Sequence, residues 1–271
     1  MVCGRRTQRC GTIPAMTTDD TAAALSIPAR PELTGGRRIG VLLSHGFTGS
    51  PASMRPWAQY LVERGYGVEL PLLPGHGTTW QELNTKTWDD WYAEIGRAHD
   101  KMRAEHDAVA LAGLSMGGAL VLRLAADRPD QVDAVAVVNP HLTTKRKDVL
   151  ALPVLKRLLP SLPGITNDIK KPGMEEHGYA RTPLKAVHSL LRAGKALAAD
   201  LPRIACPVLV FRSAEDHVVD DSSVPLITAR VSSRDVTERV LTDSYHVATL
   251  DHDAPTIFEE SADFIARVTQ R

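Results

Sequence analysis

The sequence predicts an α/β fold, in which a mostly parallel sheet carries helices on both faces. Short, continuously apolar segments alternate with segments of helical periodicity over most of the chain. Such apolar segments are typical of strands buried on both faces, and their alternation with helices is typical of parallel sheets. Several of them run directly into polar or glycine-rich turns, as expected where parallel strands end at a common edge.

Composition limits the classes of protein that remain. The chain has 271 residues, 43% of them hydrophobic, which suits one large domain. Its 32 basic and 32 acidic side chains balance, and no basic stripe supports a nucleic-acid partner. The 3 cysteines make a poor disulfide framework and favour free thiols in the cytoplasm. No apolar run approaches the ~20 residues of a membrane span, so we expect no stable membrane insertion.

The N-terminal part, residues 1–38, is interpreted as a leader and an arm. Its first residues, "MVCGRRTQRCGTIPAM", are positively charged but lack the apolar region of a secretory signal. We expect residues 1–15 to be disordered or to lie upstream of the true start. Residues 17–38 are polar and rich in proline and glycine, as in an arm that leads to the domain at 39–271.

The elements of that domain follow in order from apolar runs and helical spacing. In its first half the pattern predicts strands over 39–45, 66–73, 108–113 and 132–139, and helices over 53–65, 88–106 and 116–128. In its last part it predicts strands over 206–213 and 237–243, and helices over 223–231 and 254–268.

The alternation stops over residues 140–200. This segment carries six prolines among short leucine-rich pieces and shows no clear strand–helix rhythm. We therefore interpret it as a small cap inserted after the strand that ends near Asn139. Its expected place is above the carboxyl edge of the strands, where ligands bind in such sheets.

A candidate nucleophile lies between a strand and a helix, in Gly113-Leu114-Ser115-Met116-Gly117. A strand that turns at once into a helix has no room for side chains two positions before and after the apex, which explains the glycines. The serine is then held with its hydroxyl exposed at a helix N-terminus. The alternative is a glycine turn whose serine caps the helix.

A serine nucleophile needs a base and an acid that orients it, and in this arrangement the chain order is Ser, Asp or Glu, then His. Of the ten histidines, His246 lies past the last strand and before the last helix, where the base is required. Asp216 follows the preceding strand and is the preferred acid, with Glu215 as its rival. Asp251-His252-Asp253 lacks a second ligand cluster, so we expect no metal and no other cofactor.

Two main-chain donors are expected to stabilise an oxyanion. One is the N–H of Met116, directly after the nucleophile. The other is the N–H of Phe47, in the glycine-rich loop "SHGFTGSP" after an earlier strand. A plain tight turn at His45-Gly46 is the alternative for this loop.

Several segments together resemble bacterial monoacylglycerol lipases and related carboxylesterases of the α/β-hydrolase fold: "HGFTGSP", "PLLPGHGT", "GLSMGG", "EDHVV" and "SYHVATLD". The similarity runs from about Ile39 to the C-terminus. It implies a triad of Ser115, Asp216 and His246, and a cap over an acyl-chain tunnel. It also implies a cap glutamate that recognises glycerol hydroxyls, at Glu176 or, as the alternative, its neighbour Glu175.

These observations predict a serine hydrolase that cleaves short- to medium-chain carboxylic esters, most favourably monoacylglycerols. The expected partner is a small ester. We expect the leucines of the basic cap segment to line the tunnel, because prolines prevent one long amphipathic helix, and transient contact with lipid is the alternative. Two alternatives keep the same residues: an acyltransferase in which an alcohol replaces water, and a non-catalytic protein that senses a ligand in the pocket.

Overall fold

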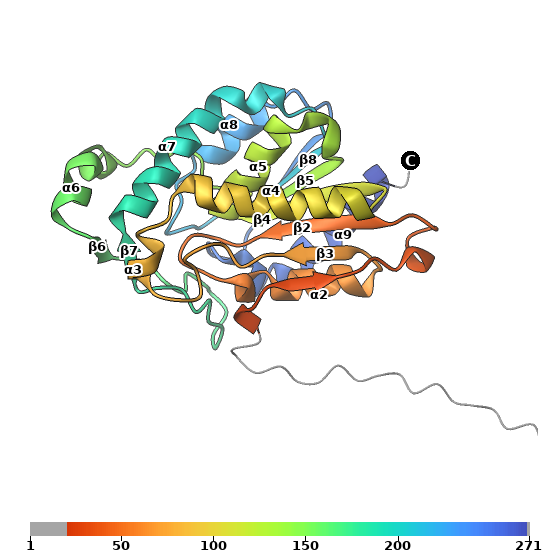
Figure 1. Cartoon of the computed structure of the whole chain (residues 1–271), viewed down its shortest axis with the longest axis horizontal. Coiled ribbons are helices and arrows are strands. Elements are labelled where there is room, and N and C mark those ends of the chain that lie inside the picture. The colour runs from red at the N-terminus through yellow and green to blue at the C-terminus, as the bar shows by residue number, and fades with distance from the viewer. Residues whose placement is uncertain (1–20, 270–271) are drawn as a thin grey trace, which may run out of the picture.

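A seven-stranded sheet forms the centre of the molecule, in a computed structural model that describes residues 21–269 (Figure 1). The strand order is β1-β3-β2-β4-β5-β8-β9, and every pairing is parallel except that of β1 with β3. The strands are β1 (Leu25–Ile27), β2 (Ile39–Ser44), β3 (Gly67–Leu70), β4 (Ala108–Leu114), β5 (Ala134–Val138), β8 (Val208–Ser213) and β9 (Val236–Leu241). This confirms the predicted fold class.

Helices cover both faces of this sheet (Figure 1). One face carries α2 (Arg55–Glu63) and α9 (Ala254–Thr269). The other carries α4 (Trp88–Glu105), α5 (Met116–Asp127), α7 (Leu184–Asp200) and α8 (Ser223–Arg230). The sheet therefore separates two hydrophobic clusters, and its inner strands are buried on both sides, as their continuous apolar runs predict.

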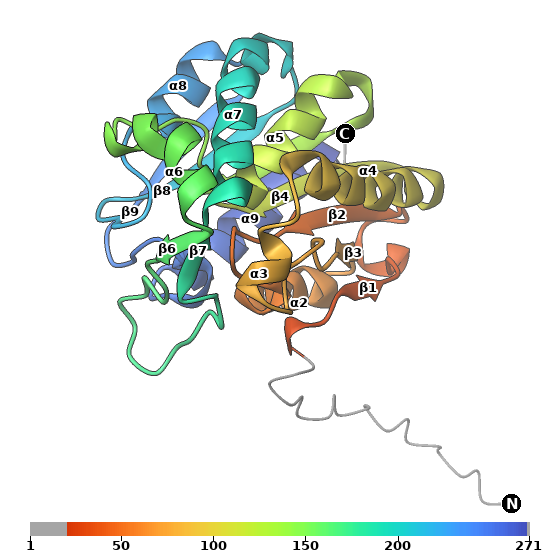
Figure 2. The same ribbon diagram turned by 60° about the vertical axis from the view of Figure 1, so that its left-hand side comes forward.

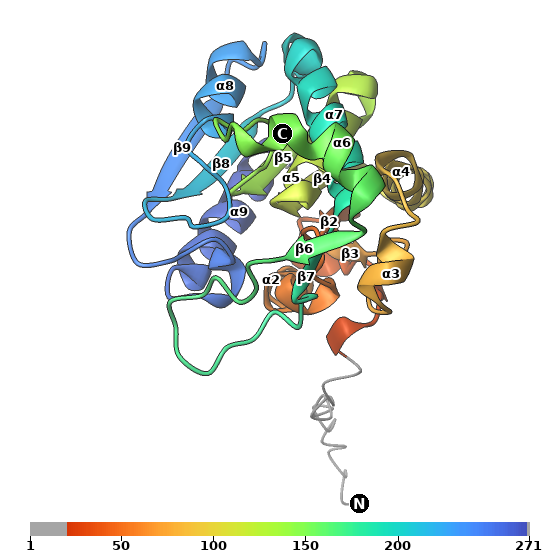
Figure 3. The same ribbon diagram turned by 90° about the vertical axis from the view of Figure 1, so that its left-hand side faces the viewer.

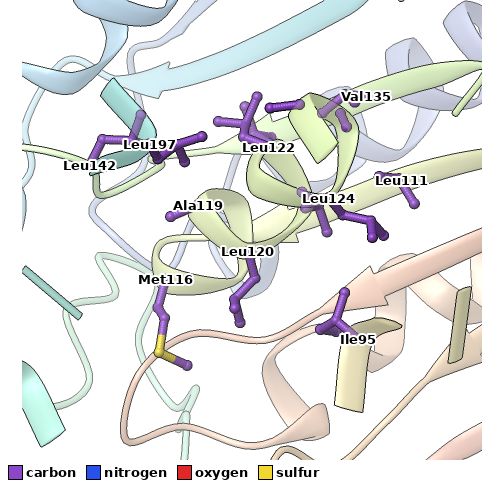
Figure 4. Close-up of a cluster of buried hydrophobic side chains, with 14 of the residues drawn as sticks. Ile95, Leu111, Met116, Ala119, Leu120, Leu122, Leu124, Val135, Leu142 and Leu197 are labelled. Carbon is purple, nitrogen blue, oxygen red and sulfur yellow. The ribbon is translucent and has the colours of Figure 1, made fainter. Parts of the chain in front are cut away.

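Helix α5 is the most deeply buried helix, and its neighbours explain why it is apolar almost all round. Leu120, Leu122 and Leu124 are fully buried among side chains of the sheet and of the flanking helices (Figure 4). The helix packs between α4 and α7 and lies over β4 and β5. Because neighbouring elements cover nearly every side, the position of its first turn is tightly held.

The N-terminal arm contributes one strand. Residues Leu25–Ile27 pair antiparallel with Val68–Leu70 of β3 and extend the edge of the sheet (Figure 2). Such a short strand cannot be predicted from this polar, proline-rich segment, because an edge strand needs no alternation of apolar and polar residues. The leader over residues 1–15 lies outside the described residues.

The segment between β5 and β8 is more regular than its sequence suggests. It contains α6 (Leu152–Leu158), a hairpin of β6 (Ser161–Pro163) and β7 (Arg181–Pro183), and the 17-residue helix α7. Helix α6 and the hairpin lie together at one end of the molecule (Figure 3). By contrast, Leu190 and Leu197 of α7 pack into the core against α5, so this end of the segment belongs to the layered fold. The short helix α3 (Trp80–Leu83) was also not predicted.

Candidate active site

Ser115 occupies a strained turn between β4 and α5. Its φ of 55° and ψ of −118° lie where L residues are rarely found. A Cβ atom on Gly113 would lie 2.5 Å from the carbonyl carbon of Gly117, and a Cβ on Gly117 would overlap the carbonyl oxygen of Ser44. Both glycines are therefore required for the strand to turn at once into the helix, as the sequence predicts.

This turn is fixed by its neighbours on the next strand. The N–H of Ser115 donates to the carbonyl of Val138 over 3.0 Å, and the carbonyl of Ser115 accepts from the N–H of His141 over 3.2 Å. Ser115 is 7% exposed, in front of the first turn of α5. The partial positive charge of a helix N-terminus therefore lies beside the residue, which favours negative charge on a nearby oxygen.

His246 and Asp216 are brought together although they lie on different loops. Nδ1 of the imidazole is 2.8 Å from Oδ2 of the carboxylate. The other carboxylate oxygen accepts the N–H groups of Val218 and Val219, each over 2.8 Å. The rival acid, Glu215, instead lies 3.3 Å from Nε2 of His217, and 60% of its side chain is exposed. Of these two neighbouring acids, it is Asp216 that orients the imidazole.

For both His246 and Asp216, burial and the neighbouring charges shift the pKa in opposite directions. Burial alone lowers the pKa of His246, but the charge and hydrogen bond of Asp216, and then the charges of Glu176 and Asp168, outweigh it, so the pKa is raised. Burial alone raises the pKa of Asp216, but the charge and hydrogen bond of His246 and the two backbone N–H groups hold it below its ordinary value. The carboxylate thus stays ionised and stabilises the imidazolium.

Asn139, at the end of β5, connects the strand ends around the site. It adopts a φ of 43°, and its side-chain amide donates to Ser213 Oγ over 2.9 Å and to the carbonyl of His246 over 2.8 Å. Its Oδ1 accepts the N–H of Ser213 over 2.8 Å. The sequence pattern marks Asn139 only as the end of a strand. The residue type could have indicated a special backbone position there, because asparagine is among the few residues that tolerate positive φ.

The three triad candidates therefore gather at the carboxyl edge of the sheet. Ser115 is bonded to Val138, and the next residue, Asn139, is bonded to the loop of His246. Within residues 21–269, no hydrogen bond joins the Ser115 hydroxyl to His246. Hydrogen bonds of this kind are often long in enzymes without substrate and tighten once it is bound.

The loop after β2 lies against Ser115. A Cβ on Gly46 would be in ordinary contact, 3.5 Å, with the Cβ of Ser115. No group in residues 21–269 accepts a hydrogen bond from the N–H of Phe47 or of Met116, which leaves both donors open. His45 anchors the loop: its Nε2 accepts the N–H of Leu73 over 3.2 Å, and burial lowers its pKa to about 4, so the ring is neutral.

Glu176 reaches the site from the segment between β6 and β7. Its Oε1 fills the space beside Gly49, only 2.7 Å from where a Cβ on that glycine would lie. Burial raises the pKa of Glu176, against the opposing charge of His246. Its neighbour Glu175 is 65% exposed and faces His177. Glu176, and not Glu175, is therefore the glutamate near the imidazole.

Within residues 21–269, no cluster of three or more His, Cys, Asp or Glu side chains has the geometry to bind a metal ion. In the same range, no helix combines the length and apolar character needed to cross a bilayer.

Comparison with known proteins agrees with this fold. The model of the Hydrolase_4 family, described as serine aminopeptidase S33, matches residues 36–253. A thermostable monoacylglycerol lipase of Bacillus sp. (strain H-257) is 39% identical over 88% of this chain and 95% of its own. A carboxylesterase of Bacillus subtilis (strain 168) is 26% identical over 89% of this chain and 98% of its own. A metagenome-derived lipolytic enzyme, reported in a study of LipS and LipT, superposes with a TM-score of 0.86 at 39% identity, over 91% of this chain and 98% of its own.

The fold and the site define an α/β hydrolase, and the chain belongs to the Hydrolase_4 family. By its relationship to these lipases and esterases it is a carboxylic ester hydrolase. The resemblance seen in the sequence is thereby confirmed.

Proposed function

We propose that this protein is a serine esterase that hydrolyses monoacylglycerols of short to medium chain length through an acyl-enzyme on Ser115. The single observation that supports it most is the 2.8 Å contact between His246 and Asp216 at the sheet edge where Ser115 occupies its strained turn. An oriented imidazole beside a serine at a helix N-terminus is suited to activate the hydroxyl.

In the acylation step, Nε2 of His246 accepts the hydroxyl proton while Oγ of Ser115 forms a bond to the ester carbonyl carbon. The carbonyl electron pair moves onto its oxygen. The N–H groups of Phe47 and Met116 donate to this oxyanion, a contribution that is typically worth a few kcal/mol. The carbonyl then re-forms, the bond to the alkoxy oxygen breaks, and the imidazolium gives its proton to the leaving alcohol.

Deacylation repeats this chemistry with water. His246 accepts a proton from water as the water oxygen attacks the acyl carbon, and the same two N–H groups bind the second oxyanion. Collapse breaks the bond to Oγ of Ser115, which takes the proton back from His246. The carboxylic acid leaves and the enzyme is restored. No step needs a metal or an organic cofactor.

Glu176 supports the choice of monoacylglycerol as substrate. Its carboxylate is buried, lies beside Gly49 of the loop that holds Phe47, and is close enough to His246 for their charges to interact. A carboxylate is an acceptor for two hydroxyl donors, as a glycerol moiety offers. The Bacillus relative named as a monoacylglycerol lipase supports the same substrate.

The insertion over about 140–200 is proposed as the cap, with transient contact to lipid. Helix α6 exposes large apolar side chains, with Val154 at 60% and Leu158 at 73% exposure, and Leu150 just before it at 79%. The expectation that Leu150 and Leu158 line a tunnel is therefore wrong, because both are open to solvent. Lys156 and Arg157 lie between them on the same helix. Apolar side chains beside cations suit the surface of a lipid aggregate that carries the substrate. A cytoplasmic location, suggested by the free thiol of Cys206, is part of the same proposal.

Substitution of the nucleophile tests the proposed function. In Ser115→Ala we expect hydrolysis of monobutyrin and p-nitrophenyl butyrate to fall by ~10⁴-fold or more, and covalent labelling by a fluorophosphonate to vanish. Ser233→Ala, on the turn before β9 at the opposite edge of the sheet, is the matched control and should keep both. A loss below tenfold in Ser115→Ala would contradict the proposal. If the fluorophosphonate did not label Ser115 in the wild-type protein, the result would favour the alternative of a non-catalytic protein that senses a ligand.

A further inference from the structure

One buried carboxylate near the site, Asp168, has no place in the mechanism above. It lies in the irregular segment between β6 and β7, and its side chain is 8% exposed. Its Oδ2 accepts two backbone N–H groups, from His246 and from His217, each over 3.1 Å. Its Oδ1 lies 2.7 Å from Nδ1 of His217. The carboxylate is thus shared between two loops that are far apart in sequence.

The two N–H groups that it binds belong to the two halves of the acid–base pair. One is the peptide N–H of His246, the base itself. The other belongs to His217, which directly follows the acid Asp216. The carbonyl of Asp168 also accepts the N–H of Val247 over 3.1 Å. One residue of the inserted segment therefore holds the backbone of both loops on either side of the imidazole–carboxylate contact.

A second buried carboxylate fixes the segment that carries Asp168. Asp251, at 1% exposure, accepts the N–H groups of Lys170 and Lys171 over 2.7 and 2.9 Å. It also accepts the N–H of Tyr245, next to the base, over 3.0 Å. Each of the two segments thus provides an aspartate whose carboxylate accepts backbone N–H groups of the other segment. These reciprocal bonds fix the position of Asp168 relative to the loop between β9 and α9 that carries His246, which we call the base loop.

We propose that Asp168 is a positioning residue that holds the loops of His246 and Asp216 at their working separation. The inference rests on the proposed function, because it assigns Asp168 a task only if His246 acts as the base. Misplacement of a catalytic group by about 1 Å typically costs about 100-fold in rate, so a carboxylate that sets the loop spacing acts on turnover without touching substrate.

The ring of His217 is not a competing base. Its side chain is 48% exposed, its Nε2 faces Glu215 at 3.3 Å, and its ring stands edge-on to Tyr245 at 4.7 Å. Both ring nitrogens thus face carboxylates, Nδ1 that of Asp168 and Nε2 that of Glu215. The important bonds of Asp168 are therefore those to the backbone, and the His217 ring balances part of its charge.

Two substitutions of Asp168 separate the effect of its hydrogen bonds to the backbone from the effect of its negative charge. Asp168→Asn keeps an oxygen that can accept both backbone N–H groups but removes the negative charge. Asp168→Ala removes both and leaves two buried N–H groups unpaired. Asp243→Asn is the matched control, because Asp243 lies on the same base loop but is 59% exposed and faces Lys170.

We expect kcat on p-nitrophenyl butyrate to fall about 10- to 100-fold in Asp168→Ala and less than about fivefold in Asp168→Asn, with KM within about threefold of wild type in both. The pH profile of kcat/KM gives a second readout. The charged or titratable groups that face the imidazole are Asp216, Glu176, Asp168 and His141. Asp168→Asn removes one anion, so the acidic limb should move to lower pH, whereas Asp243→Asn should leave it in place.

Two results would overturn the inference. One is an Asp168→Ala variant with unchanged melting temperature and kcat within threefold of wild type. The other is a loss that is equal in Asp168→Asn and Asp168→Ala without a shift of the acidic limb. If Asp168→Ala does not fold, Asp168→Ser takes its place in the same comparison, because its shorter side chain also leaves the two backbone N–H groups without their carboxylate acceptor. Failure of the proposed function would look different, because Ser115→Ala would then retain activity whatever Asp168 does.

Discussion

Nδ1 of His246 lies 2.8 Å from Oδ2 of Asp216, although the two residues are 30 positions apart and belong to loops after different strands. The contact leaves Nε2 as the free nitrogen of the ring, the one that has to accept a proton. It also couples the charge of the carboxylate to the titration of the imidazole. Two consequences can be measured, one in the pH dependence of the reaction and one in its rate.

The pH dependence should follow His246. Its pKa is raised above the ordinary value of 6.5, and the base works only when neutral. We therefore expect kcat/KM to increase with pH through an apparent pKa above 6.5. In Asp216→Asn the anion that favours the imidazolium is lost, so that pKa should fall and kcat should drop by about 100-fold or more. A pH–rate profile of both proteins would show this, and an unmoved acidic limb in Asp216→Asn would contradict the assignment.

The glycine after the serine turn should be intolerant of any side chain. A Cβ on Gly117 would overlap the carbonyl oxygen of Ser44, so Gly117→Ala must displace either α5 or the loop that holds Phe47. We expect a loss of about 1–3 kcal/mol in the free energy of unfolding and a fall in kcat of about tenfold or more, measured by urea unfolding and ester hydrolysis.

Gly96, in the middle of α4, offers the matched control. A Cβ there would have no neighbour nearer than 3.5 Å. Gly96→Ala should therefore keep kcat and stabilise the helix by up to about 1 kcal/mol. If Gly117→Ala behaved in the same way, the tight packing of the serine turn would have no importance for the reaction.

Glu176 should affect the alcohol part of the substrate. In Glu176→Gln we expect kcat/KM on monobutyrin to fall by about tenfold, because a charged acceptor for the hydroxyls is lost, while p-nitrophenyl butyrate changes by less than about threefold. Glu175→Gln, one residue away and largely exposed, should change neither. Equal losses on both esters in Glu176→Gln would remove the proposed role in glycerol recognition.

The exposed side chains of α6 should determine contact with lipid. In the double variant Val154→Ser/Leu158→Ser we expect the fraction that sediments with phosphatidylglycerol vesicles to fall several-fold, since both residues are more than half exposed. Hydrolysis of a dissolved short ester should be unchanged. Val240→Ser, an exposed apolar residue of β9, serves as control. Binding that is the same in all three proteins would argue against the cap as the lipid-contacting surface.

The strands and helices around the site could be predicted because each carries its own periodic signal. The apolar run over 39–45 became β2, and the run over 108–113 became β4, to within a residue at each end. The helix expected over 116–128 is α5. Where the signal is weak, the structure differed: α7 packs Leu190 and Leu197 into the core although prolines before it obscure the pattern.

The sequence by itself determined the main strands and helices around the site, the turn that carries Ser115 and the loops that carry Asp216 and His246, because apolar spacing and glycine placement act locally. Only the tertiary structure decided between Asp216 and Glu215, and between Glu176 and Glu175, since adjacent side chains point in different directions and the loop backbone selects which faces the imidazole. Asp168 shows the same limit more strongly. Its partners lie 49 and 78 positions away, and no local pattern marks an aspartate whose importance arises from the backbone of two distant loops.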